Sequence, residues 1–68
     1  SGDDKRISLK ELLDKIVRMS ILYYSTDNAD AKLKVKDQIS KIVKKSHKFR
    51  ETNKKDYEFM TKLARNIT

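Results

Sequence analysis

The chain carries almost none of the residues that interrupt helices. Proline is absent and the only glycine is Gly2, so neither residue occurs from Asp3 to Thr68. Proline and glycine are the strongest sequence signals for turns and helix ends. We therefore expect a helical chain whose element boundaries are marked by polar capping residues.

A capping signature predicts where the first helix begins. Ser8 is a favourable N-cap, and Glu11 stands three positions later, where it completes a capping box. Ile7 can pack against Leu12 as a hydrophobic staple. Apolar residues then recur at three- and four-residue spacing. The pattern predicts a first helix over Leu9–Ser25, with a stripe broad enough to pack against two other helices.

A polar stretch at 25–30 is the clearest loop signal in the chain. Asp27 or Asn28 is expected to cap a second helix that runs to about Glu51. The alternation of lysine with apolar residues at 32–36 is also compatible with a short strand. It has no partner strand, however, and continues into a helical pattern, so we assign it to the second helix.

A third helix is predicted to close the chain. Thr52 or Asn53 is expected to cap it, with the Asp56 carboxylate in its first turn. Amphipathic helices joined by short loops bury their apolar stripes against one another, and the simplest arrangement of three is a bundle. The predicted fold class is therefore all-α, a small three-helix bundle, with a helical homodimer left open.

The length of the chain limits the size of the core. A domain of 68 residues buries only about 60% of the surface that its unfolded chain exposes. There is no cysteine, and His47 is the only histidine, so disulfides and zinc are not expected to reinforce the core. We expect a disordered segment at 1–7, beginning with a Ser-Gly pair typical of a cleaved tag, and one three-helix domain at 8–68.

The apolar residues of the three stripes are expected to form one core. Leucine and isoleucine at helical spacing are most often buried, and Val17, Ile21 and Tyr24 widen the first stripe. Four aromatic residues are likewise expected inside the core: Tyr24, Phe49, Tyr57 and Phe59.

The residue types needed for catalysis or metal binding do not occur in the required combinations. His47 is the only conventional general base, and with Ser46 and Lys48 beside it no catalytic triad results. Asp27 and Asp30 lack the glycine and the terminal glutamate of a calcium-binding loop. We therefore expect no enzyme activity, no cofactor, no metal site and no small-molecule substrate.

The excess of positive charge is the most informative functional feature. Seventeen basic and ten acidic residues give a formal net charge of +7, which favours polyanionic partners. From Lys41 to Lys55, seven basic residues stand against the single acid Glu51. At about 100° per residue, four lysines fall on one helix face, roughly opposite the apolar stripe. We call them the lysine ridge: Lys41, Lys44, Lys45 and Lys48.

The lysine ridge predicts a non-enzymatic module that binds DNA or RNA through phosphate contacts. Because lysine rarely makes bidentate contacts to bases, such binding tolerates many sequences. In addition, the outer face of the third helix presents Arg65 and Asn66, which would read base edges if that helix entered the major groove. The candidate nucleic-acid-binding residues are Lys34, Lys41, Lys44, Lys45, Lys48, Arg50, Lys54, Lys55, Lys62 and Arg65.

Other interpretations remain open at the level of sequence. The lysine face is compatible with a purely solvating role. The domain is also compatible with protein interaction, in which an apolar groove containing Tyr23, Phe49 or Phe59 accepts a partner helix, or two copies associate. A lipid-surface helix is disfavoured because the apolar stripes are needed for one core. No apolar run reaches the roughly 20 residues of a membrane span, and the lack of cysteine favours a cytoplasmic or nuclear location.

The order of a capped helix, a polar loop, a long helix and a short closing helix resembles that of KIX domains. These are small bundles whose groove accepts amphipathic activation helices. The nearest local likeness covers Asn53–Met60 and contains no diagnostic motif, so no binding residue is carried over from it.

Overall fold

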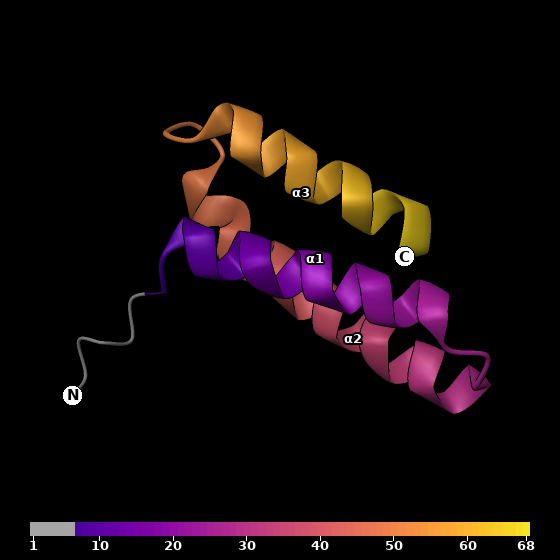
Figure 1. The fold of residues 1–68 in the computed structure, drawn as a ribbon. Helices are drawn as coiled ribbons and strands as arrows, with labels where there is room; N and C mark the ends of the chain where they lie inside the picture. The colour runs from indigo at the N-terminus through magenta and orange to yellow at the C-terminus, as the bar shows by residue number, and fades with distance from the viewer. Residues whose placement is uncertain (1–6) are drawn as a thin grey trace.

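Three α-helices make up most of residues 7–68, the part of the chain that the computed structural model describes (Figure 1). They are α1 (Leu9–Ser25), α2 (Ala29–Ser46) and α3 (Lys54–Ile67), and a 3₁₀ turn, η2 (His47–Phe49), follows α2. Each helix runs antiparallel to the one before it, and α3 packs against both α1 and α2. The predicted all-α three-helix bundle is confirmed.

The predicted disordered segment at 1–7 lies outside the described residues except for its last member. Ile7 is described, is half-buried, and packs against the core.

The helix α1 begins at the predicted capping box. The Ser8 hydroxyl accepts a hydrogen bond from the backbone N–H of Glu11 at 3.1 Å, and the Glu11 carboxylate accepts one from the backbone N–H of Ser8 at 3.0 Å. The hydrogen bond from the Ser8 backbone N–H lowers the pKa of the Glu11 carboxyl, as do, to a smaller extent, its interaction with the Ser8 side chain and the Lys15 ammonium. Because the bonds favour the ionised carboxylate, the capping box weakens as the pH falls through that lowered pKa.

The connection between α1 and α2 is short and held by hydrogen bonds. Asn28, one of the two predicted caps, occupies the N-cap of α2, and its side chain accepts a hydrogen bond from the Ala31 N–H at 2.9 Å. Lys32 donates a hydrogen bond to the Tyr23 backbone carbonyl, and its Nζ lies 4.0 Å from the centroid of the Tyr23 ring. The run at 32–36 is helical, as predicted.

The helix α2 is shorter than predicted. It ends at Ser46, whereas the sequence pattern predicted an end at about Glu51. The buried Ser46 hydroxyl donates a hydrogen bond to the Val43 carbonyl oxygen at 2.7 Å. In a continuing α-helix that carbonyl would accept from the His47 N–H, which instead bonds to the Lys44 carbonyl, three residues back. The α-helix tightens at this point into the 3₁₀ turn η2.

The start of α3 is only partly as predicted. Asn53 occupies the N-cap position, but its side chain makes no capping hydrogen bond. Its side-chain amide oxygen instead accepts a hydrogen bond from the Thr52 hydroxyl at 2.9 Å. Asp56 lies in the first turn, as expected, where its carboxylate is favoured by the helix dipole.

The core is one cluster of nine buried apolar side chains, three from each helix. Two serines, Ser20 and Ser46, are also buried, and each hydroxyl is bonded to a carbonyl of its own helix. Within residues 7–68, no buried side-chain nitrogen or oxygen lacks a hydrogen-bond partner. The nine core residues are Leu9, Leu12, Ile16, Val35, Ile39, Ile42, Met60, Ala64 and Ile67.

Several residues predicted to lie in the core are exposed instead. Ile21 and Tyr24 are each 64% exposed, Phe59 is 49% exposed, and Val17 is 37% exposed. Phe49 and Tyr57 are half-buried. Two neighbouring helices cover only part of the broad apolar stripe of α1, so its outer edge remains in contact with solvent.

Candidate nucleic-acid interface

The four residues of the lysine ridge are exposed on one side of the bundle. Lys41, Lys44 and Lys45 lie in the last two turns of α2, and Lys48 follows in η2. Helical geometry places them away from the buried face of α2, which carries Ile39 and Ile42. The ridge therefore presents its ammonium groups to solvent.

Of the four ridge lysines, only Lys41 forms an ion pair within residues 7–68. Lys41 Nζ lies 3.2 Å from Asp37 Oδ2, and both side chains are more than 60% exposed. Exposed pairs of this kind contribute about 0–1 kcal/mol. Within residues 7–68, no other ridge lysine has a carboxylate at ion-pair distance. A phosphate can therefore displace Asp37 at little energetic cost.

Lys34 lies on the ridge side of α2, but acidic residues surround it. Asp30 precedes it by four residues and Asp37 follows it by three, and all three side chains are exposed. Residues at these spacings are neighbours on a helix surface. The positive charge of α2 is therefore concentrated from Lys41 onward.

A groove between α1 and α2 lies on one side of the ridge. Lys41 and Lys45 of α2 line it together with Lys15 of α1 and the Gln38 side chain. Its base is apolar and consists of Leu12, Met19 and Ile42.

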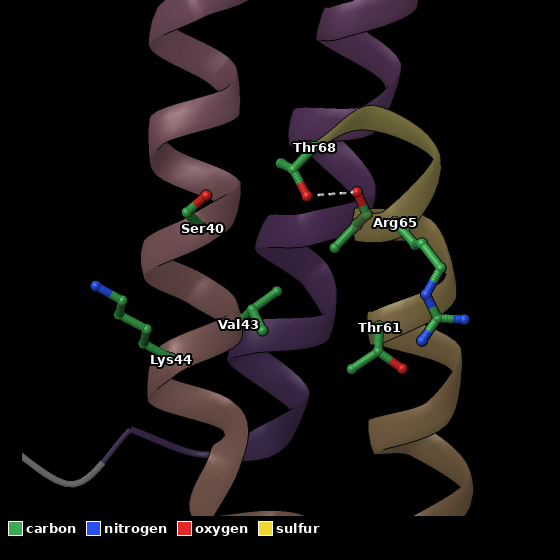
Figure 2. A pocket seen from close by; sticks show the side chains of 7 residues that line it. Ser40, Val43, Lys44, Thr61, Arg65 and Thr68 are labelled. Atoms are coloured by element: carbon green, nitrogen blue, oxygen red, sulfur yellow. Dashed lines mark hydrogen bonds between the residues drawn. The ribbon is translucent and has the colours of Figure 1, made fainter.

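A second groove, between α2 and α3, lies on the other side of the ridge. Lys44 stands on its α2 side and Arg65 on its α3 side, and Figure 2 shows the two side chains extending away from each other. The Thr61 and Thr68 hydroxyls donate hydrogen bonds to the Glu58 and Ala64 carbonyls, so their protons are already engaged. The groove thus separates two cations by a largely apolar surface.

The remaining candidate residues do not all join the ridge. Arg50 lies in the turn after η2. At about 100° per residue, Lys54 falls on the side of α3 that carries Arg65, whereas Lys55 and Lys62 fall on the outer side, near Phe59. All of these side chains are exposed, as is Asn66. The structure therefore gathers part of the predicted set on the α2 side of the bundle and places Lys55 and Lys62 elsewhere.

Sequence reasoning did not include Lys15 among the candidates. In sequence it is one of several polar residues outside the apolar stripe of α1. Only the packing of α1 beside α2 brings it to the groove that Lys41 and Lys45 also line. The helical period alone contains no signal for this juxtaposition.

The single histidine and the acidic side chains were the other candidates for catalysis or metal binding. The His47 side chain is exposed, and its ring lies 6.1 Å from the Tyr57 ring. No group of three or more His, Cys, Asp or Glu side chains is placed to hold a metal ion. None of the three helices combines the length and the apolar character that a membrane crossing requires.

In comparisons with known proteins, no family model, no curated sequence and no solved structure matches the chain. The class that the structure defines is a small all-α three-helix bundle, and its function has to be inferred from its own surface.

Proposed function

We propose that this domain is a non-enzymatic module that binds the phosphate backbone of DNA or RNA. The observation that carries the proposal is the exposure of four ridge lysines on one side of α2 and η2, only one of which has an ion pair within residues 7–68. Binding to a nucleic acid would neutralise phosphates and release condensed counterions, which drives association without regard to sequence.

The dimensions of the ridge suit a strand of nucleic acid. Seven helical steps from Lys41 to Lys48 span about 10 Å. Each strand of duplex DNA carries one phosphate per about 3.4 Å of helix axis, so a length of about 10 Å along the axis contains about three phosphates of one strand. Lys15 and Arg65, across the two flanking grooves, widen the basic surface beyond a single helix.

We expect the affinity for nucleic acid to fall steeply with salt. If about six phosphates are neutralised, the Kd should rise about a thousandfold between 50 and 200 mM NaCl. Fluorescence anisotropy with labelled random-sequence duplex DNA and single-stranded RNA measures the slope and determines which form is preferred. Binding that does not change with salt, or no binding of either form at 50 mM, would refute the proposal.

A second function, protein interaction, is favoured by an apolar groove between α1 and α3. Val17, Ile21 and Tyr24 of α1 and Phe59 and Leu63 of α3 line this groove, and all but Leu63 are exposed. Contiguous exposed apolar surface on a small domain marks an interaction site more often than scattered apolar residues do. Of the groove residues expected from sequence, only Phe59 is present, because Tyr23 and Phe49 pack against the core.

We propose an amphipathic helix with acidic flanks as the occupant of this groove. Val17, Ile21 and Tyr24 form a line of about two turns, which fits the apolar anchors of a partner helix. Lys55 and Lys62, one turn before and after Phe59, edge the outer side of α3, whereas Asp14 and Arg18 of α1 neutralise each other at 2.9 Å. A second copy is disfavoured because two chains of charge +7 repel each other.

Ile21→Gln is expected to weaken binding of a synthetic amphipathic helix with leucine anchors and glutamate flanks at least tenfold, because it removes an exposed apolar contact. Leu33→Gln is the matched control: Leu33 is 63% exposed on α2, outside the groove, and its loss should change the Kd less than twofold. Anisotropy measures both. A peptide with the same glutamates but no apolar anchors should bind weakly. Equal binding of that peptide, or self-association of the protein that Ile21→Gln abolishes, would contradict the proposal.

A further inference from the structure

The groove between α1 and α2 is lined by three cations, whereas the α2–α3 groove is lined by two and the α1–α3 groove by none. Lys15 reaches it from α1, and Lys41 and Lys45 reach it from α2. No carboxylate is among its lining residues, and Gln38 adds an amide whose N–H groups can donate hydrogen bonds. Three like charges at one groove repel each other, and a bound anion relieves that repulsion.

The two carboxylates that lie one helical turn before Lys15 and Lys41 are already engaged. Glu11, one turn before Lys15, is held in the capping box by Ser8. Asp37, one turn before Lys41, makes an exposed ion pair with it. The capping box draws the Glu11 carboxylate toward the N-terminal end of α1. The Asp37–Lys41 pair is weak enough for a phosphate to displace. The groove therefore keeps a local excess of positive charge.

The base of the groove strengthens its attraction for an anion. Leu12 and Ile42 are buried, and Met19 is half-buried beside them. An apolar base holds no charge-screening side chains and lowers the local dielectric constant, so charge interactions above it are stronger than on an open surface. A phosphate placed among the three lysines would accept hydrogen bonds from ammonium groups of two different helices.

We propose that the α1–α2 groove anchors a single backbone phosphate of the nucleic acid through Lys15, Lys41 and Lys45. This inference rests on the proposed function and makes it more specific, because it assigns one defined site within a surface that is otherwise only basic. It also adds a binding residue, Lys15, that lies outside the lysine ridge. A strand held in this groove contacts both α1 and α2.

Lys10 provides the matched control for Lys15. Both lysines are exposed and lie on α1, so exchanging either for glutamine removes the same charge from the same helix. The five helical steps from Lys10 to Lys15 correspond to a rotation of about 140° around the helix. Lys10 therefore lies on the side of α1 away from this groove, and it is not among the residues that line it.

Lys15→Gln is expected to raise the Kd for the labelled oligonucleotide about five- to tenfold at 100 mM NaCl and to reduce the salt slope by about 1. Lys10→Gln should raise the Kd less than twofold, and Lys15→Arg should retain most of the affinity. Equal losses for Lys10→Gln and Lys15→Gln, or none for either, would overturn the inference while the wild type still binds. No binding by the wild type would instead refute the proposed function itself.

A double-mutant cycle tests whether the lysines share one phosphate. If they do, the losses from Lys15→Gln and Lys45→Gln will not add in the double variant, because the phosphate contact is already lost in each single variant. Additive losses would show that the two lysines hold different phosphates and would overturn the single-site assignment. Circular dichroism of each variant checks that the helices are retained.

Discussion

Exchange of all four lysines of the ridge for glutamate is expected to abolish nucleic-acid binding. The change removes four positive charges and adds four negative ones, so the formal net charge of +7 becomes −1. Because the ridge is proposed to make several of the phosphate contacts, we expect the Kd at 100 mM NaCl to rise at least a hundredfold. Anisotropy with the same oligonucleotides, or a gel shift, measures the loss.

The control is a variant with the same net charge and an intact ridge. Lys10, Arg18, Lys55 and Lys62 are exposed cations outside the ridge, and changing them to glutamate should weaken binding much less. Similar losses in the two variants would mean that net charge, rather than the ridge, determines binding. A Lys→Gln version of the ridge variant avoids placing carboxylates in the last turn of α2, where they oppose the helix dipole.

Ile39→Ala is expected to remove much of the stability of the domain. Ile39 is fully buried at the centre of the core, and truncation of a buried isoleucine to alanine typically lowers the free energy of unfolding by about 2–5 kcal/mol. A domain of this size has a total of about 3–10 kcal/mol. Urea denaturation followed by circular dichroism measures the change.

Leu33→Ala is the control for Ile39→Ala. Leu33 is an aliphatic residue of the same helix but is 63% exposed, so its truncation should change the free energy of unfolding by less than about 0.5 kcal/mol. Equal destabilisation by the two substitutions would contradict the arrangement of the core.

Local sequence signals predicted the starts of α1 and α2 because capping depends on residues only a few positions apart. The Ser8 and Glu11 box and the Asn28 cap are interactions within one helical turn. The end of α2 was predicted wrongly because Phe49 continues the apolar spacing beyond Ser46. The spacing does not reveal that the His47 N–H bonds to the Lys44 carbonyl, three residues back, instead of continuing the α-helical pattern.

The lysine ridge is determined by the sequence of one helix, whereas the α1–α2 groove and the apolar α1–α3 groove are determined by how the helices pack. The ridge follows from the period of a single helix, so its shared face could be predicted from Lys41 to Lys48 alone. Lys15 and the apolar groove depend on which side of α1 meets α2 and which meets α3. For the same reason, Tyr24 and Phe59 were assigned to the core, although the bundle leaves both of them exposed.

The kind of contact that joins the helices determines how this protein responds to added salt. Both ion pairs within residues 7–68 are intrahelical, and the Lys32 hydrogen bond to Tyr23 is the one side-chain hydrogen bond there that joins two helices. The helices are held together by apolar contacts, which salt does not weaken, while added salt screens the mutual repulsion of the surplus cations. Release of a polyanion at high salt would therefore report on the complex and not on unfolding of the bundle.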